Sequence, residues 1–397
     1  MVLSNYIKNI GIVLSILFFI FLLNPYDLTV KSGYGLIAIL VLLKGRTITH
    51  AIDKDFLVLL AFGFTYSMFN YFGDNKGVQY LIIQAFFPIF FYSLGKLIIH
   101  NNLSAKQIIY LLLGIGFVYS ITILLSTIFN LVDGGFEQSD RFVPSYWNGN
   151  PIKATTAASY LIYNSIIPAV IVANKKRFGI VPIAILLLIY IVTLICSFRL
   201  GSRTLIAISL VSCLVTILYI IYKQNLRSNL KFIATLVAIA IIVYLYVPIN
   251  WNSPIFSTLG QRFKTGGAVE STATAGNRTG LWMDGLVNLF ENPLGWKSRH
   301  FHHNMWLDTA KNGGIIPLLF FIINNIFCYK YIKKSLALPN KDFGLNITFI
   351  LFFLSTFLLF FTEPVIDGNF FSIVLYCFFF GVLKKYLQIQ NQRLTNI

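Results

Sequence analysis

Three histidines lie within four residues of one another in the segment SRHFHHNMWLD, residues 298–308, beside an apolar run. An imidazole can serve as a base, ligate a metal or lie in solvent, because its ordinary pKa is close to neutral pH. A transition-metal site needs three or four convergent ligands, and the four cysteines of the chain all fall within apolar runs instead. We therefore expect no metal here, and we expect His300 and His302 to be ordinary residues of a solvated turn.

His303 differs from its neighbours because a polar stripe follows it. Asn304, Asp308 and Lys311 are spaced i, i+4 and i+7, so they share one face of a helix entering the membrane. Polar groups at that depth usually face a cavity. A neutral imidazole beside a cavity can accept a proton from a hydroxyl group. The sequence thus predicts His303 as a catalytic base, with Asn304 and Asp308 as supporting residues.

Arginines form the second group of residues that could do chemistry. Arg199 and Arg203 are four apart in the turn FRLGSRT, residues 198–204, so they share a face if a helix begins there. The Gly-Ser pair before Arg203 leaves room for close approach and can cap that helix. Guanidinium groups at a membrane surface either anchor the chain to lipid headgroups or bind phosphate.

A third arginine, Arg278, lies in AGNRTGLWMDGLVNLFENP, residues 275–293. This segment predicts a short helix that Asn277 caps and that Asn292-Pro293 ends. Its apolar stripe consists of Trp282, Leu286, Leu289 and Phe290. Such a helix is expected to lie flat on a membrane. Its N-terminus, where Arg278 stands, already favours anions.

The composition of the whole chain explains why these residues are notable. The 397 residues are 57% hydrophobic and 11% charged, whereas soluble domains have roughly 25% charged residues. Apolar runs of about 18 residues can cross a bilayer as helices. The sequence predicts an all-α polytopic membrane protein, a single integral domain over residues 1–397. About twelve spans are expected, at roughly 8–24, 28–43, 55–72, 78–95, 108–131, 154–173, 178–197, 204–222, 232–248, 305–329, 343–361 and 369–386.

Charge predicts how the spans are oriented. With both termini on one side, that side holds 19 of the 31 lysines and arginines, so it is expected to be cytoplasmic. The net charge of +17 is then mainly a topology signal and gives no argument for nucleic-acid binding. The opposite, outer side carries the segment 132–154, the turn 198–204 and a loop at 249–304 with short amphipathic helices. Ten basic residues from Arg141 to Lys311 lie on this side, although most lysines and arginines lie on the cytoplasmic side. A lipid-linked phosphate or diphosphate would suit these ten charges.

The order of these features resembles that of a known family. A Ser-Arg turn between two spans is followed by a long outer loop with an arginine-initiated helix containing Trp282. Then come Asn-Pro-Leu-Gly-Trp at 292–296, His303-Asn304 and a span with a Gly-Gly pair. This order is similar to that of the O-antigen ligase and Wzy-type O-antigen or capsule polymerase family of bacterial envelopes. The similarity is greatest from about 140 to 325.

The resemblance implies an inner-membrane glycosyltransferase with its active site on the periplasmic face. It would act on glycans linked to undecaprenyl diphosphate, without a metal or another cofactor. Arg203 and Arg278 would hold the diphosphate, Arg141 would match a further loop arginine less closely, and Arg199 would be an additional phosphate contact. His303 would be the base on the acceptor hydroxyl. Expected partners are the lipid-linked donor, a glycan acceptor and membrane lipids. A chain-length regulator protein is a further candidate partner.

Two members of that family differ only in their acceptor. A polymerase transfers the glycan to the non-reducing end of another lipid-linked repeat unit, and a ligase transfers it to the lipid A core in lipopolysaccharide biosynthesis. The compact segment between Arg278 and His303 favours a polymerase, because a ligase must also seat a bulky core lipid. A flippase or other transporter and a structural scaffold are the alternatives from other classes. Against transport, the span centres lack acidic and basic residues.

Overall fold

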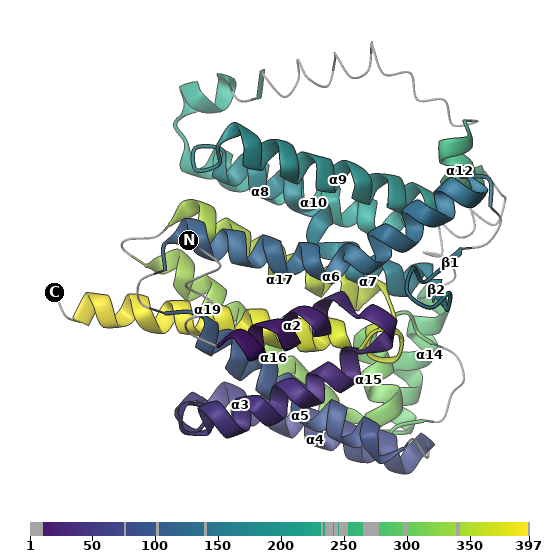
Figure 1. The fold of residues 1–397 in the computed structure, drawn as a ribbon, viewed down its shortest axis with the longest axis vertical. Coiled ribbons are helices and arrows are strands. Elements are labelled where there is room, and N and C mark those ends of the chain that lie inside the picture. The colour runs from purple at the N-terminus through teal and green to yellow at the C-terminus, as the bar shows by residue number, and fades with distance from the viewer. Residues whose placement is uncertain are drawn as a thin grey trace.

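The protein is a bundle of helices whose ends gather at two opposite faces (Figure 1). In this computed structural model the described residues are 11–74, 77–100, 103–138, 141–231, 233–234, 241, 245, 253–264, 278–296, 301–338 and 342–395. The long helices are α3 Thr29–Ala51, α4 Lys54–Asp74, α5 Val78–Ile98, α6 Ala105–Gly134, α9 Ile180–Arg199, α10 Arg203–Lys223, α16 Ile315–Ala337, α17 Phe343–Thr362 and α19 Phe371–Thr395. The shorter ones are α2 Ile12–Leu23, α7 Ala154–Ser165, α8 Ile167–Asn174, α12 Ser257–Lys264, α14 Arg278–Glu291, α15 Met305–Gly313 and α18 Val365–Gly368, with 3-10 turns η1 Pro25–Asp27 and η2 Pro254–Phe256.

Among the described residues, eight helical segments are long and apolar enough to cross a membrane. They are α5, α6, α7 with α8, α9, α10, α16, α17 and α19. Helices α3 and α4 have 23 and 21 residues but are not among these eight, and α2 is a shorter apolar helix of 12 residues. Most of the ninth predicted run, 232–248, lies outside the described residues. The chain is therefore a helical, multi-pass membrane protein.

The structure differs from the predicted elements in three places. The predicted span 305–329 is divided, because α15 ends at Gly313 and α16 begins at Ile315. The last helix runs on to Thr395, well past the expected end at 386. An antiparallel pair of three-residue strands, β1 Phe142–Pro144 and β2 Pro151–Lys153, lies between α6 and α7. These strands are too short for hydrophobic periodicity to reveal them.

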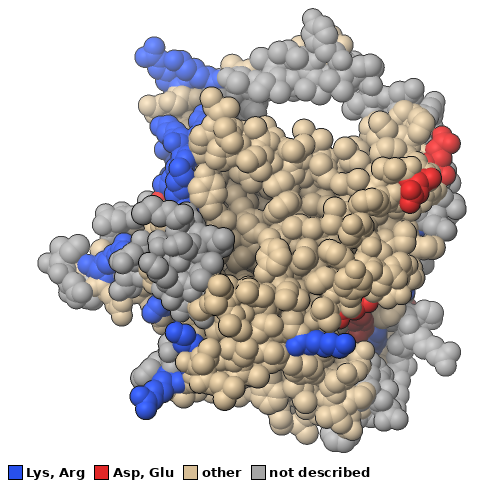
Figure 2. Space-filling view, in the orientation of Figure 1, with Lys and Arg blue, Asp and Glu red and all other residues tan. Residues whose placement is uncertain are grey.

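The two ends of the bundle differ in charge. Most of the lysines and arginines visible in Figure 2 gather at the end where the C-terminus lies, and most of the visible acidic surface lies toward the opposite end. That opposite end carries β1, β2, α12 and α14 (Figure 1). The positive-inside rule predicts this kind of separation between the two faces of a membrane protein.

Helix α19 forms the centre of the bundle and packs directly against α5. Within α19, 89% of an apolar stretch of 18 residues is buried. A Cβ atom added at Gly95 would collide with the backbone of Phe378, and one at Gly381 would collide with the backbone of Tyr92. Small residues allow helix backbones to approach closely in membranes, where no hydrophobic force drives helices together. In the corresponding apolar stretches, α9 is only 22% buried and α10 only 33% buried. Their apolar side chains therefore face lipid.

The break between α15 and α16 is held by the segment that follows α14. Gly314 adopts a left-handed φ of +72°, and its added Cβ would lie 2.7 Å from the Pro293 oxygen. The amide of Ile315 donates to that same oxygen over 2.8 Å, and the amide of Trp296 donates to the Lys311 carbonyl over 3.0 Å. These contacts tie the chain after α14 to the start of α16. They place α14 and α15 side by side.

We predict that Gly314→Ala destabilises the protein. The left-handed backbone and the contact with Pro293 both oppose a methyl group, and such a replacement costs more than about 1 kcal/mol when φ is positive. A lower midpoint of thermal unfolding in detergent would show the effect. Gly114→Ala is the control, because no atom lies within 4 Å of the added methyl group in the middle of α6. Equal midpoints for the two variants would contradict the packing described here.

Candidate active site at the ends of α10, α14 and α17

Arg203 is the first residue of α10, immediately after a tight turn. Gly201 has a φ of +58°, and the amide of Ser202 donates to the Ser197 carbonyl over 2.9 Å, which closes the end of α9. The Ser202 hydroxyl then accepts from the Leu205 amide over 3.5 Å and caps α10. The expectation that Ser202 caps this helix is confirmed. The turn places Arg203 at the positive end of the α10 dipole.

Arg278 is likewise the first residue of α14. The predicted helix is present, although its expected cap, Asn277, lies outside the described residues. One face of α14 is apolar and exposed, and its residues are Met283, Leu286, Val287 and Phe290. Trp282 turns away from this face, and its indole nitrogen donates to the His302 carbonyl over 2.9 Å.

Glu363 links the two arginine-bearing helix ends. It follows α17 and is only 4% exposed. Its Oε1 accepts from the Thr204 hydroxyl over 2.8 Å and lies 3.7 Å from an Arg278 guanidinium nitrogen. One buried carboxylate therefore connects the start of α10, the start of α14 and the end of α17.

Arg141 belongs to the same group of charges. Its Nε donates to the Leu200 carbonyl over 3.3 Å, which brings the residue to the turn before Arg203. Desolvation lowers the pKa of Arg141, Glu363 raises it, and the positive charges of Arg203 and Arg278 lower it further. A guanidinium stays charged in spite of such shifts. The three arginines are thus close enough to repel one another, and only Glu363 among these four side chains is negative.

A cavity of about 690 Å³ opens beside these charges. The β1–β2 hairpin and the turn η1 supply much of its wall. Arg141 and His303 both line it, as do Asp27 and Tyr160 from the N-terminal half and Asp367 from α18. The predicted base and one predicted arginine therefore face the same space.

The wall contributed by η1 is unusual in its backbone. Asn24, Tyr26 and Asp27 all have φ between 49° and 58°, the left-handed region that residues other than glycine seldom adopt. The Asp27 carboxylate holds the hairpin, because it accepts from the side-chain amides of Asn148 and Asn150. Strain of this kind persists only where surrounding contacts hold it, and it is often found at binding sites.

His303 has the properties expected of a neutral base. Desolvation lowers its pKa below the ordinary value, and the positive charge of Arg278 lowers it further, while Asp308 acts in the opposite direction. The ring is therefore neutral near pH 7. Its Nδ1 is buried without a hydrogen-bond partner in the described part of the chain. The residue has a φ of +50°, so its backbone turns sharply away from the residue before it.

His302 does not lie in solvent, contrary to expectation. It is 3% exposed, and both its amide and its Nδ1 lie within 3.0 Å of Asp308 Oδ1. The Trp296 ring meets its imidazole edge to face, with centroids 5.6 Å apart. Asp308, predicted to support His303, thus bonds His302 directly. It acts on His303 only through its charge and through the backbone that links the two histidines. Asn304 caps α15, accepting from the amides of Trp306 and Leu307.

The structure places Arg199 away from the cavity. The side chain is fully buried, with Nε donating to the Asn130 side chain over 2.9 Å and a terminal nitrogen donating to Gln138. It fastens the end of α9 to the end of α6. Although Arg199 and Arg203 are four apart, a turn and a change of helix separate them, so the expected shared face does not exist.

The remaining basic residues of the outer segments have different positions. Lys153 lines the cavity, and Lys311 pairs with Asp367 over 3.3 Å. The Asp367 carboxylate also accepts from Asn312 over 2.9 Å. Several other residues of this group cannot be placed at side-chain level, because they or their side chains lie outside the described residues; these are Arg262, Lys264, Lys297, Arg299 and His300.

No protein-family model and no curated protein matches the chain. Within the described residues, no group of three or more His, Cys, Asp or Glu side chains is placed to hold a metal ion.

Three acidic residues of the site escaped the sequence analysis. They are Asp27, Glu363 and Asp367, and each stands at the end of an apolar run. The segment TEPVIDG, residues 362–368, offered a signal, since two carboxylates fall within six residues between two predicted spans. Acidic residues are rare in this chain, so carboxylates at the same end as the arginines indicate charge pairing there.

We predict that Arg278→Gln raises the pKa of His303, because the replacement removes a positive neighbour. An NMR titration of the histidine rings measures the change, and the chain has only five histidines. Arg227→Gln is the control, since Arg227 is exposed beyond the far end of α10. An unchanged His303 pKa in Arg278→Gln would contradict the proximity of the two residues.

Proposed function

We propose that this chain is a bacterial inner-membrane glycosyltransferase that polymerises an O-antigen, capsule or exopolysaccharide. It transfers a glycan from undecaprenyl diphosphate to a hydroxyl at the non-reducing end of another lipid-linked repeat unit. The observation that carries the proposal is a neutral His303 that shares one cavity with Arg141, while Arg203 and Arg278 lie close to Arg141 beside that cavity. A base beside a cationic seat is what transfer from a diphosphate requires.

The arginines suit the leaving group. Arg141, Arg203 and Arg278 bring three positive charges against the single carboxylate of Glu363, so the cluster retains excess positive charge. Guanidinium groups pair with phosphate oxygens in a bidentate way. The positive charge would stabilise a diphosphate bound here, and the diphosphate would in turn offset the repulsion among the arginines. Stabilising the charge that develops on a leaving group is commonly the largest part of catalysis.

The proposed reaction is a single displacement with inversion. His303 takes the proton from the acceptor hydroxyl, whose oxygen forms a bond to the anomeric carbon of the donor sugar. The bond from that carbon to the diphosphate oxygen breaks, and the electron pair leaves with the diphosphate. General-base assistance of this kind contributes roughly a hundredfold to ten-thousandfold in rate.

The rest of the cavity suits sugar rings. Its wall near η1 presents the Asp27 carboxylate, the Asn150 side chain and the Tyr160 ring. The exposed Tyr26 ring lies 5.7 Å from the Trp147 ring nearby. Carboxylates and amides bind hydroxyl groups, and aromatic rings pack on the apolar faces of sugars. A glycan could thus extend from the arginines toward η1.

The exposed apolar face of α14 fits a lipid-linked substrate. Met283, Leu286, Val287 and Phe290 lie on the same helix whose first residue is Arg278. An apolar face of this kind favours a helix that rests in the membrane surface. The diphosphate of a polyprenyl carrier would then meet Arg278 at headgroup depth while its lipid tail stays in the bilayer.

A ligase would use the same donor half of the site and differ in its acceptor. A deletion strain separates the two on a glycan gel. Loss of a polymerase leaves a single repeat unit on the core, whereas loss of a ligase leaves polymer attached to undecaprenyl diphosphate. A flippase would move lipid-linked units across liposomes without lengthening them.

We predict that His303→Ala and Arg278→Ala each lower polymer formation at least about a hundredfold, through loss of the base and of leaving-group stabilisation. Complementation of the deletion strain, read on a glycan gel, measures the loss while membrane fractions confirm insertion. Arg227→Ala is the matched control, because this arginine is exposed beyond the far end of α10. Normal chain-length ladders in the two site variants would refute the assignment.

We further predict that Asp27→Asn raises the KM for a lipid-linked glycan roughly tenfold with little change in kcat. The replacement removes a charged acceptor for a sugar hydroxyl and weakens the contacts with Asn148 and Asn150 that hold the cavity wall, and both losses act in ground and transition states alike. Steady-state rates with donor and acceptor varied in turn identify which glycan meets Asp27. Asp133→Asn, at the exposed end of α6, is the control. A fall in kcat at unchanged KM would instead place Asp27 in the chemical step.

A further inference from the structure

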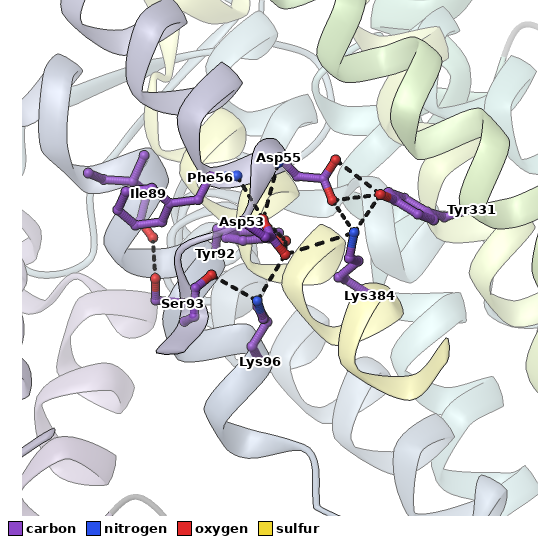
Figure 3. A network of polar contacts seen from close by, with 10 residues as sticks. Asp53, Asp55, Phe56, Ile89, Tyr92, Ser93, Lys96, Tyr331 and Lys384 are labelled. Carbon is purple, nitrogen blue, oxygen red and sulfur yellow. Dashed lines mark hydrogen bonds and ion pairs between the residues drawn. The ribbon is translucent and has the colours of Figure 1, made fainter. Parts of the chain in front are cut away.

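The end of the bundle opposite the candidate active site contains a second cluster of charges. Asp55 is fully buried, and its carboxylate accepts from the Tyr331 hydroxyl over 2.8 Å and from the Lys384 ammonium. Asp53 accepts from the Lys96 ammonium over 3.0 Å and lies 3.8 Å from the Lys384 nitrogen. Figure 3 shows these side chains converging from α4 and the residue just before it, α5, α16 and α19.

This cluster has a structural consequence for Lys384. Carboxylates from the start of α4 hold the ammonium of Lys384 beside the Tyr331 ring, with the nitrogen 4.1 Å from the ring centroid. A lysine side chain that is otherwise flexible is thus fixed in position. Lys384 and Tyr331 then form part of the wall of a neighbouring cavity.

That cavity has a volume of about 580 Å³ and an unusual lining. Three lysines, Lys54, Lys334 and Lys384, reach it from three different helices. Gln388 and Asn391 add side-chain amides, and the described lining residues include no carboxylate. The lining therefore offers hydrogen-bond donors and positive charge, which selects for an anion.

Only one of the three lysines is neutralised by a recorded ion pair. Lys384 pairs with Asp55, whereas the structure records no ion pair for Lys54 or Lys334 within the described residues. Both of these side chains are exposed, and each lies near an aromatic ring instead, Phe327 at 4.9 Å and Tyr331 at 5.8 Å. Two ammonium groups without an ion-pair partner in the described part of the chain therefore face one cavity.

The position of the cavity favours a lipid ligand. It lies at the end of the bundle where lysines and arginines gather (Figure 2), between the last turns of α16 and the C-terminal half of α19. Ala337, Leu338 and Leu387 form an apolar part of its wall. Basic pockets between membrane helices bind the head groups of anionic lipids, with apolar wall for the glycerol and acyl chains.

We propose that this cavity binds the phosphate of an anionic phospholipid, with Lys54 and Lys334 as its charged ligands and Lys384, held by Asp55, as a fixed hydrogen-bond donor. The bound headgroup would bridge α4, α16 and α19. Lipid binding at this end of the bundle is separate from the glycan site and does not depend on the function proposed above.

Native mass spectrometry of the full-length protein in detergent tests the proposal, with phosphatidylglycerol as the anionic lipid and phosphatidylcholine as the zwitterionic one. We expect the wild type to retain phosphatidylglycerol preferentially. Lys54→Gln/Lys334→Gln should weaken that binding roughly tenfold, given the contribution of each lysine near an anionic surface. Both side chains are exposed, so the fold should persist, and circular dichroism with gel filtration checks this.

The matched control is Lys330→Gln/Lys333→Gln. It removes the same charge, and both residues are exposed on α16, but neither lines the cavity. We expect this variant to bind phosphatidylglycerol within about twofold of the wild type, in contrast to the roughly tenfold loss above. Equal weakening in both variants would show diffuse attraction of lipid to a basic surface and would overturn the proposal.

A second arm separates a lipid from a free anion. Inorganic phosphate is added in place of lipid, and the midpoint of thermal unfolding is measured. A stabilisation by phosphatidylglycerol that is lost in Lys54→Gln/Lys334→Gln, with little effect of inorganic phosphate, supports the lipid assignment. Equal stabilisation by inorganic phosphate, or no preference over phosphatidylcholine, would overturn it.

Discussion

The buried carboxylate of Glu363 is the interaction on which the arrangement of the candidate active site depends. Three guanidinium groups cannot lose their protons, so bringing them together in a partly desolvated place requires an opposite charge. Glu363 supplies that charge from the end of α17, where it bonds Thr204 and lies near Arg278. Without it, the arginines would repel one another and move toward solvent. With it, the cluster keeps a positive excess that a bound anion can offset.

Helix ends, rather than helix faces, position most of the groups around this carboxylate. Arg203 and Arg278 are the first residues of α10 and α14, Glu363 ends α17, and Asn304 caps α15. Helix termini leave backbone amides and carbonyls unpaired, and N-termini carry partial positive charge. The backbone thus adds to the positive field of the arginine side chains. The close contact of Gly314 with Pro293 keeps α14 beside α15, so these two helices keep their relative positions.

Hydropathy was sufficient to predict the helical, membrane-spanning class, and local helix signals placed Arg203 and Arg278 at helix starts. Spacing was insufficient for the histidines, because two adjacent residues can face opposite ways when one has a left-handed backbone, as His303 does. The same limit applies to Arg199, which is four residues from Arg203 but belongs to another helix. Glu363 and Asp27 were missed because a single carboxylate at a span end gives no local signal, and its pairing depends on elements distant in sequence.

The ring of His303, the predicted base, has no carboxylate partner among the described residues, because Asp308 holds His302 instead. Its basicity is therefore set mainly by desolvation and by the nearby arginines, which lower its pKa. A base with a lowered pKa is always available but weak. In the proposed reaction, the diphosphate would neutralise Arg278 and Arg141 and thereby raise the His303 pKa toward the operating pH. The base would then become strongest when the donor is bound, which couples proton abstraction to the presence of a leaving group and disfavours deprotonation in an empty site.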